Sequence, residues 1–298
     1  MKIIAIDLDG TLLTGNLSIQ EKDINALKKV QKQEHIVTIA TGRALFDAKH
    51  IMHKYNLNCP IIASNGAQIY VDNKKVYEHF MNSDVIHPII QWLNKEDLYY
   101  QMYLSDKIVV SNQGIHQLEK QLYDVINQDS QFNNDEFWKA VEAQIFQYGL
   151  EEVPCVIAPT DYRFVIKFMI VSPDISKLKQ AKEYFSQLDR CTVSSSGSFN
   201  LEIMSTGVDK GVALHKLCEY YRIHTTEAIA IGDNLNDVSM LKVAGIGIAM
   251  GNADETLSKV ATFKTLSNDN CGVAYALEHY MQAPKEENHT SIRSNRND

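Results

Sequence analysis

The sequence lacks paired cysteines and long apolar runs. Its five cysteines are scattered, odd in number, and nowhere spaced as CxxC, so a disulfide framework is not indicated. Reduced thiols are typical of the cytoplasm, and we expect the protein there. No run of about 18 apolar residues occurs, which predicts no membrane span. Asp7 and Asp9 interrupt the first apolar stretch too early for a signal peptide.

An excess of positive charge is missing as well. The chain has 29 Lys and Arg residues against 37 Asp and Glu residues, a formal net charge of −8. This acidic balance disfavours a nucleic-acid partner or an anionic membrane surface. No feature of the sequence indicates an oligomeric state.

Glycine is nearly absent from the middle of the chain. Residues 83–190 contain only Gly114 and Gly149, together with long helical stretches and isolated strands. Residues 1–82 and 191–283 instead alternate apolar, strand-like runs with helical periodicity, which is typical of a parallel sheet covered by helices. The predicted fold class is α/β, with a Rossmann-like parallel-sheet core and an inserted α+β domain.

The periodicity also predicts individual elements. In the two outer segments we expect strands at 3–6, 36–40, 60–63, 201–204, 228–231 and 247–249, and helices at 19–33, 44–55, 210–221, 237–243 and 253–260. A hairpin is predicted over 68–80. In the insert we expect helices at 84–93, 115–128 and 175–188, and strands at 99–104 and 164–171. Residues 284–298 have almost no apolar side chains, which predicts a disordered tail.

Polar motifs follow four of the predicted strands in the outer segments. In an open parallel sheet, ligands bind beyond the carboxyl ends of the strands, so these motifs are expected to meet at one edge. The motifs are Asp7-Leu8-Asp9-Gly10-Thr11, Thr41-Gly42-Arg43, Ser64-Asn65-Gly66, and Gly232-Asp233 with Asn236-Asp237.

The spacing of Asp7 and Asp9 has two interpretations. Residues two apart in a strand share a face, and two buried carboxylates there cost several kcal/mol without a partner. In one interpretation Asp9 only caps a bend at Gly10. In the other, Asp233 and Asp237 complete a cluster of acids that holds Mg²⁺, the ion that suits hard oxygen ligands. Asp7 can then be a nucleophile, and Asp9 can protonate a leaving oxygen.

Lys210 stands in the first turn of a predicted helix, after Asp209 as the N-cap. A lysine there meets the positive end of the helix dipole, which is mildly unfavourable. It is either a solvated surface residue or a cation directed at phosphate, alongside the N–H groups of the helix end. Thr41 and Asn65 would add uncharged donors. Arg43 either binds phosphate or pairs with an acid, and both interpretations stay open.

Taken together, these motifs resemble the haloacid dehalogenase superfamily, and most closely its Cof-type phosphatases, which carry a large α+β cap inserted after the third core strand. The resemblance covers nearly all of residues 1–82 and about 195–280. It implies a catalytic core over 1–82 and 191–283 and a cap for substrate specificity over 83–190. It also implies a Mg²⁺-dependent phosphatase that hydrolyses small phosphorylated metabolites, such as sugar phosphates or phosphorylated cofactors, through an aspartyl-phosphate.

The resemblance further implies a role for each motif residue. Asp7 would be the nucleophile and Asp9 the general acid and base. Mg²⁺ would be held by Asp7, the carbonyl of Asp9 and Asp233. Asp237 is a further candidate site residue. Phosphate would be contacted by Leu8, Thr41, Gly42, Asn65, Lys210 and Asn236.

Two other functions share parts of the pattern. A phosphomutase of the same superfamily would keep the phospho-aspartate for a second sugar hydroxyl instead of water. A receiver-type signalling module also gathers acids, a Thr and a Lys on a parallel sheet. Such modules are much shorter and carry their phospho-acceptor after the third strand, where this chain has Ser64 and Asn65.

The insert contributes two further candidates. Tyr103, in a run of aromatic residues, and Lys167, which interrupts an apolar strand, can contact substrate. The alternatives are ordinary strand alternation for Tyr103 and an edge or snorkelling lysine for Lys167.

Overall fold

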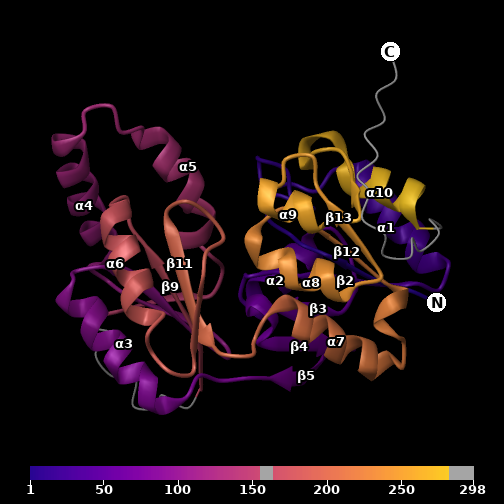
Figure 1. Cartoon of the computed structure of the whole chain (residues 1–298), viewed down its shortest axis with the longest axis horizontal. Coiled ribbons are helices and arrows are strands. Elements are labelled where there is room, and N and C mark those ends of the chain that lie inside the picture. The colour runs from indigo at the N-terminus through magenta and orange to yellow at the C-terminus, as the bar shows by residue number, and fades with distance from the viewer. Residues whose placement is uncertain (155–163, 282–298) are drawn as a thin grey trace.

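Two sheets divide the chain into two parts. The computed structural model describes residues 1–154 and 164–281 (Figure 1). The larger sheet lies on the right of Figure 1, with both described ends of the chain, and the smaller sheet lies on the left. In the described chain, no helix has the length and apolar character needed to cross a membrane.

The larger sheet has eight strands in the described residues, and six of them, from β14 to β3, pair in parallel. In chain order the strands are β1 (Ile3–Ile6), β2 (Ile36–Ala40), β3 (Ile61–Ala63), β4 (Gln68–Val71), β5 (Lys74–Glu78), β12 (Ala228–Gly232), β13 (Ile246–Ala249) and β14 (Phe263–Lys264). Across the sheet their order is β14-β13-β12-β1-β2-β3-β4-β5, and β4 and β5 form the predicted antiparallel hairpin. The predicted Rossmann-like parallel core is confirmed.

Helices cover both faces of this sheet. The alternating side chains of β1 show the two layers: Ile4 belongs to the same buried cluster as Leu27, and Ile3 belongs to the cluster that contains Leu214. A parallel sheet needs this double cover because its strands are apolar on both faces. The first layer contains α1 (Glu21–Lys32), α2 (Leu45–Lys54) and α10 (Gly272–Tyr280), and the second contains α7 (Lys210–Tyr221), α8 (Val238–Val243) and α9 (Glu255–Val260).

The smaller sheet has six strands in the described residues and is mostly antiparallel. Its strands are β6 (Tyr99–Leu104), β7 (Ile108–Ser111), β8 (Leu150–Val153), β9 (Val165–Val171), β10 (Cys191–Ser194) and β11 (Asn200–Ser205), in the order β10-β11-β9-β6-β7-β8. Only β7 and β8 pair in parallel among these strands. Side chains of α3 (Ser83–Lys95) and α6 (Ile175–Phe185) pack on one face, and those of α4 (Gly114–Gln128) and α5 (Asn134–Ile145) on the other.

One predicted boundary is wrong. The strand expected in the core at 201–204 is β11, and it pairs with β9 and β10 in the smaller sheet. The chain therefore returns to the larger sheet only after Ser205, and not at residue 191. A short apolar run indicates a strand but contains no information about which sheet it joins, because pairing is a long-range property.

The chain crosses between the two parts twice, from β5 to α3 and from β11 to α7 (Figure 1). The smaller sheet and its helices are thus one contiguous insert. The other predicted strands and helices of the described residues are present, with ends that differ by a few residues. The prediction missed β7, β8, β10, β14 and α10 and gave no range for α5, and the predicted tail lies outside the described residues.

Candidate active site

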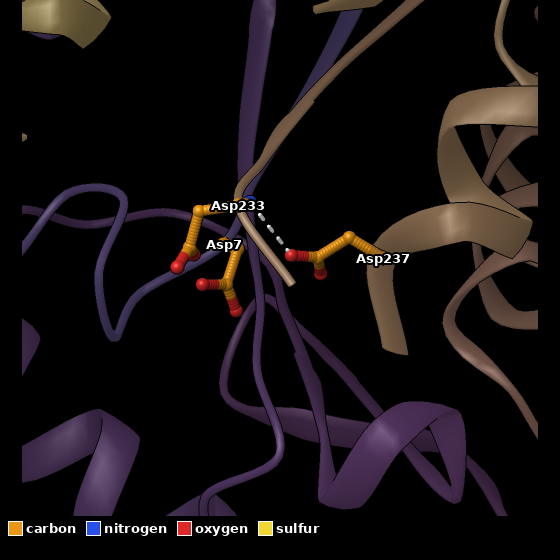
Figure 2. A group of neighbouring side chains, drawn as sticks. All are labelled: Asp7, Asp233 and Asp237. Carbon is orange, nitrogen blue, oxygen red and sulfur yellow. Dashed lines mark hydrogen bonds between the residues drawn. The ribbon is translucent and has the colours of Figure 1, made fainter. Parts of the chain in front are cut away.

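Three aspartates gather where two neighbouring parallel strands end. Asp7 follows β1, and its N–H donates to the carbonyl of Ile231 in β12 at 2.9 Å. Asp233 follows β12, and Asp237 ends the short helix η4 (Leu235–Asp237). One oxygen from each of the three carboxylates lies within 4.8 Å of the others. Figure 2 shows Asp7 and Asp233 side by side, with Asp237 reaching toward them from the helical side.

A left-handed turn at Gly10 directly follows Asp9. Gly10 has a φ of +80°, and a Cβ atom built there would lie 2.3 Å from Oδ2 of Asp233. Only glycine therefore fits this position. The next residue, Thr11, donates its hydroxyl to Oδ1 of Asp233 at 2.8 Å, which fixes the Asp233 carboxylate against the turn.

Lys210 is fully buried between two of the aspartates. Its Nζ donates to Oδ1 of Asp7 and to Oδ1 of Asp237, both at 2.6 Å. Asp209 caps the helix as predicted and accepts from the N–H of Val212 at 2.8 Å. The interpretation of Lys210 as a solvated surface lysine is wrong. Burial lowers the Lys210 pKa, but Asp237 and Asp7 outweigh burial, so the net pKa is above its usual range.

The cluster has more negative charge than its lysine balances. Burial, and then the charge of Asp237, raise the pKa of Asp7 well above its usual range, against the opposing charge of Lys210. The same two causes raise the pKa of Asp233 to about 7. A raised carboxyl pKa means that the charged form is disfavoured in this environment. An additional cation would stabilise the charged forms.

The three carboxylates differ in how many hydrogen bonds they accept from the protein. Asp237 accepts from Lys210 and, through Oδ2, from the backbone N–H groups of Asp233 at 3.0 Å and Asn234 at 3.1 Å. Asp237 therefore serves the fold of this loop. Asp7 accepts from Lys210 and Asp233 accepts from Thr11, and both carboxylates retain oxygen positions that suit a hard cation such as Mg²⁺.

Arg43 binds Asp9 with two parallel bonds. Its Nε donates to Oδ2 of Asp9 at 2.7 Å and its Nη2 to Oδ1 at 2.6 Å. Nη1 donates to Oδ2 of Asp47 at 2.8 Å. Burial lowers the pKa of Arg43, but Asp9 and Asp47 raise it above its usual range. Of the two interpretations, pairing with an acid describes this structure. The sequence analysis missed Asp47, although its spacing of four from Arg43 was a usable signal.

Hydrogen bonds connect several of the remaining predicted site residues. The N–H of Arg43 donates to the Thr41 hydroxyl at 3.1 Å, which leaves that hydroxyl's own proton to donate elsewhere. Oδ1 of Asn65 accepts from Nδ2 of Asn236 at 3.1 Å. The side chain of Leu8 is fully buried in the core, so only its backbone can reach a ligand.

A cavity of about 310 Å³ lies over this cluster and is lined from both sheets. Lys210, Thr41 and Asn65 lie behind its wall, in contact with residues that line it. The predicted site residues in the wall are Asp7, Asp9, Gly42, Arg43, Asp233 and Asn236. From the insert the wall includes Tyr103, Lys139, Gln144, Gln147, Lys167 and Glu202. The sequence analysis missed Lys139, Glu202 and the two glutamines.

Lys167 corrects an expectation. It lies in β9, between β11 and β6 in the middle of the smaller sheet, and is 1% exposed. It is therefore neither an edge lysine nor a snorkelling one. Its Nζ donates to the carbonyl of Gly42 at 2.7 Å and to Oε1 of Glu202 at 3.0 Å, so it connects the insert to the core.

Comparison with known proteins agrees with this architecture. Residues 4–277 match the family model for haloacid dehalogenase-like hydrolases, and the chain belongs to that family. The phosphatase YwpJ of Bacillus subtilis (strain 168) is 32% identical over 288 residues, 94% of this chain and 100% of YwpJ. The 5-amino-6-(5-phospho-D-ribitylamino)uracil phosphatase YwtE of the same organism is 35% identical over 283 residues, 94% of this chain and 98% of YwtE.

The fold has a similarly close match among solved structures. A haloacid dehalogenase-like hydrolase from B. subtilis superposes with a TM-score of 0.82 at 31% identity, covering 94% of this chain and 100% of that one. The expected superfamily and the expectation of a phosphatase are both confirmed.

Proposed function

We propose that this phosphatase transfers the phosphoryl group of a small phosphorylated metabolite to Asp7 and then to water. The observation that carries the proposal is the setting of Asp7. Its carboxylate lines the cavity, and Nζ of Lys210 donates to Oδ1 of Asp7 at 2.6 Å from behind the cavity wall. The other oxygen is the candidate for attack on phosphorus, since a fixed nucleophile loses little freedom in the reaction.

Asp9 is proposed as the proton carrier. It lines the same cavity, and its side chain is 45% exposed. In this structure each of its oxygens accepts one bond from Arg43 and keeps a second lone pair that can take a proton. In its protonated form Asp9 would give that proton to the leaving oxygen as the P–O bond breaks, and the resulting carboxylate would later take a proton from the water that releases phosphate from Asp7.

A bound Mg²⁺ is proposed at the carboxylates that are still free to accept. The side chains of Asp7 and Asp233 and the carbonyl of Asp9 would hold it, while Asp237 stays with Lys210 and the backbone. The raised pKa values of Asp7 and Asp233 support a cation here. When bound, Mg²⁺ supplies the positive charge that offsets repulsion between Asp7 and an incoming phosphate.

Phosphate contacts are proposed for the groups around this pair. Thr41 retains a hydroxyl proton to donate, and Lys210 supplies the nearest buried positive charge. The backbone of Leu8 and Gly42 and the amides of Asn65 and Asn236 complete the set. Donors directed at the phosphoryl oxygens stabilise the charge that develops during transfer.

The substrate is proposed to be a phosphate ester of a small polar metabolite. The cavity wall contributed by the insert carries amide, hydroxyl and charged side chains, and its volume of about 310 Å³ suits a sugar-sized leaving group. Because YwtE is named for 5-amino-6-(5-phospho-D-ribitylamino)uracil, we propose that compound as the first member of the panel to test. Sugar phosphates and phosphorylated cofactors follow.

The test is phosphate release by the purified full-length chain from this panel and from p-nitrophenyl phosphate. We expect turnover with Mg²⁺, loss of turnover with EDTA, and recovery when Mg²⁺ is restored. Transfer of the phosphoryl group to a second hydroxyl instead of water would indicate a phosphomutase. Full turnover of the chelated enzyme would contradict the metal assignment, and no release from any ester would contradict the proposed reaction.

A further inference from the structure

One face of the smaller sheet forms the roof of the active site. Tyr103 of β6 and Met204 of β11 lie directly opposite Lys167 of β9. Glu202 is two residues from Met204 and therefore shares that face, diagonal to Lys167. Tyr103, Lys167 and Glu202 all line the cavity.

The Lys167 ammonium is fully engaged by protein groups. It donates to the carbonyl of Gly42 at 2.7 Å and to Oε1 of Glu202 at 3.0 Å, and it lies 4.4 Å from the centre of the Tyr103 ring. A buried ammonium is costly unless such partners surround it. All three contacts are with protein groups, which favours a positioning role for Lys167 over direct binding of a substrate.

The contact with Gly42 fixes one peptide of the phosphate site. Lys167 holds the carbonyl of the Gly42–Arg43 peptide, and the hydroxyl of Thr41 accepts from its N–H at 3.1 Å. Because a peptide is planar, holding both groups sets its orientation. Gly42 needs such support, since glycine alone leaves the backbone free to rotate.

Glu202 makes the matching contact on the other side of the site. Its Oε2 accepts from Nδ2 of Asn65, and Oδ1 of Asn65 accepts from Nδ2 of Asn236 at 3.1 Å. Glu202 and Asn65 are 3% and 1% exposed. The insert thus sets the amide of Asn65 through Glu202, and the peptide after Gly42 through Lys167.

We infer that Lys167 and Glu202 are positioning residues that complete the phosphate site when the insert lies against the core. The inference rests on the proposed function, because the groups that they orient are the proposed phosphate ligands. It makes the phosphoryl transfer of every substrate dependent on the insert, including esters with small leaving groups. If the ion pair only stabilised the fold, its removal would lower stability and leave the turnover of the folded enzyme intact.

The test compares the full-length wild type with Lys167→Met/Glu202→Gln. The double substitution keeps the side-chain shapes and removes both charges. Either single substitution would leave one buried charge without its partner. Lys177→Met is the matched control, because Lys177 also donates to a carbonyl, that of Glu96 at 2.9 Å, but within the insert. The test measures kcat and KM with Mg²⁺ for p-nitrophenyl phosphate and for the larger esters of the panel, the Kd of inorganic phosphate by calorimetry, and the thermal midpoint.

We expect the double variant to lose at least tenfold in kcat and to bind inorganic phosphate at least fivefold more weakly, with Lys177→Met unchanged in both. A folded double variant with wild-type kcat and phosphate affinity would overturn the inference. So would a loss confined to the KM of large substrates, which would make the pair a substrate contact. If the wild type hydrolysed no ester, the proposed function would fail, and the phosphate Kd values would still decide the role of the pair.

Discussion

The two sheets carry their polar groups in different places. In the larger sheet, Asp7, Thr41 and Asp233 stand just beyond the ends of parallel strands. In the smaller sheet, Lys167 and Glu202 stand inside antiparallel strands, with apolar neighbours on either side along the chain. Strand ends of a parallel sheet meet at one edge, whereas residues inside an antiparallel sheet meet only through register.

The core and the insert therefore contribute to the same site in two different ways. The core assembles its charges in short loops, where each side chain is free to turn toward a common point. The insert presents a rigid face, on which the position of Lys167 over Gly42 depends on the pairing of β9 with β6 and β11. We therefore expect core substitutions to remove chemistry directly, and substitutions on the insert's face to act through the groups that they orient.

The largest expected effect is the loss of the Asp7 nucleophile. Asp7→Asn keeps the shape of the side chain but replaces the carboxylate with an amide that does not attack phosphorus. We expect turnover of every ester to fall by roughly 10⁴-fold or more. Borohydride trapping or intact-mass analysis should detect a phospho-enzyme in the wild type and none in the variant.

The matched control for this comparison is Asp124→Asn, an exposed carboxylate on α4 of the insert. It should leave turnover unchanged. A trapped phosphoryl group on any residue other than Asp7, or on the Asp7→Asn protein, would contradict the assignment of Asp7 as the nucleophile. The proposed division between a core that carries the chemistry and an insert that positions its groups would then fail.

The next effect concerns the lysine beneath the nucleophile. Lys210→Met leaves Asp7 and Asp237 buried without their shared cation, so we expect a loss of about 3–5 kcal/mol in unfolding free energy. The loss of its charge should also lower kcat/KM by roughly 10²–10³-fold, as for a strong electrostatic donor. Urea denaturation and steady-state kinetics measure the two effects separately.

Lys210→Met/Asp237→Asn makes the comparison sharper, because it removes one of the two stranded carboxylates. We expect this double variant to recover part of the lost stability and none of the activity. Recovery of activity along with stability would mean that Lys210 serves only the fold. Wild-type kinetics in the single variant would lead to the same conclusion.

The contrast between the sheets also explains which parts of the site could be predicted. The core motifs were readable because each follows an apolar strand directly, and parallel strands bring their ends together whatever the exact register. The pairing of Arg43 stayed open, since residue types alone do not indicate whether a guanidinium meets Asp9 or a phosphate. The structure shows that the guanidinium meets both oxygens of Asp9.

The insert was less predictable for a physical reason. Glu202 is one polar residue in an apolar strand, and nothing nearby in the sequence marks it as the partner of Lys167, 35 residues earlier. Their contact depends on the register of β9 and β11, and so does the assignment of β11 to the smaller sheet. Register follows from packing of the whole sheet, which a local pattern does not contain.

The smallest expected effect is a change in stability without a change in activity. It concerns Asp23, a buried acid of the core that lies outside the site. Asp23 of α1 is 1% exposed, and its Oδ1 accepts from the N–H of Ala274 at 2.8 Å, in the first turn of α10. Burial raises its pKa from 3.8 to about 6, against the opposing hydrogen bond from Ala274. Between these two pH values the folded chain binds more protons than the unfolded one, so stability falls as pH rises from about 4 through 6.

Asp23→Asn keeps the shape and an acceptor oxygen but carries no charge, and it should remove this pH dependence. We expect the variant to be about 1–2 kcal/mol more stable than the wild type at pH 7.5, a few degrees in thermal midpoint, with roughly half that gain at pH 5. Thermal unfolding at the two pH values measures the difference, with Asp124→Asn as the control that gains no stability at either pH.

Because Asp23 lies outside the cavity wall, kcat at pH 7.5 should stay at the wild-type value. An equal gain at both pH values would show that the Asp23 carboxyl does not titrate between them, and a fall in kcat would extend the chemical role of the core beyond the strand ends.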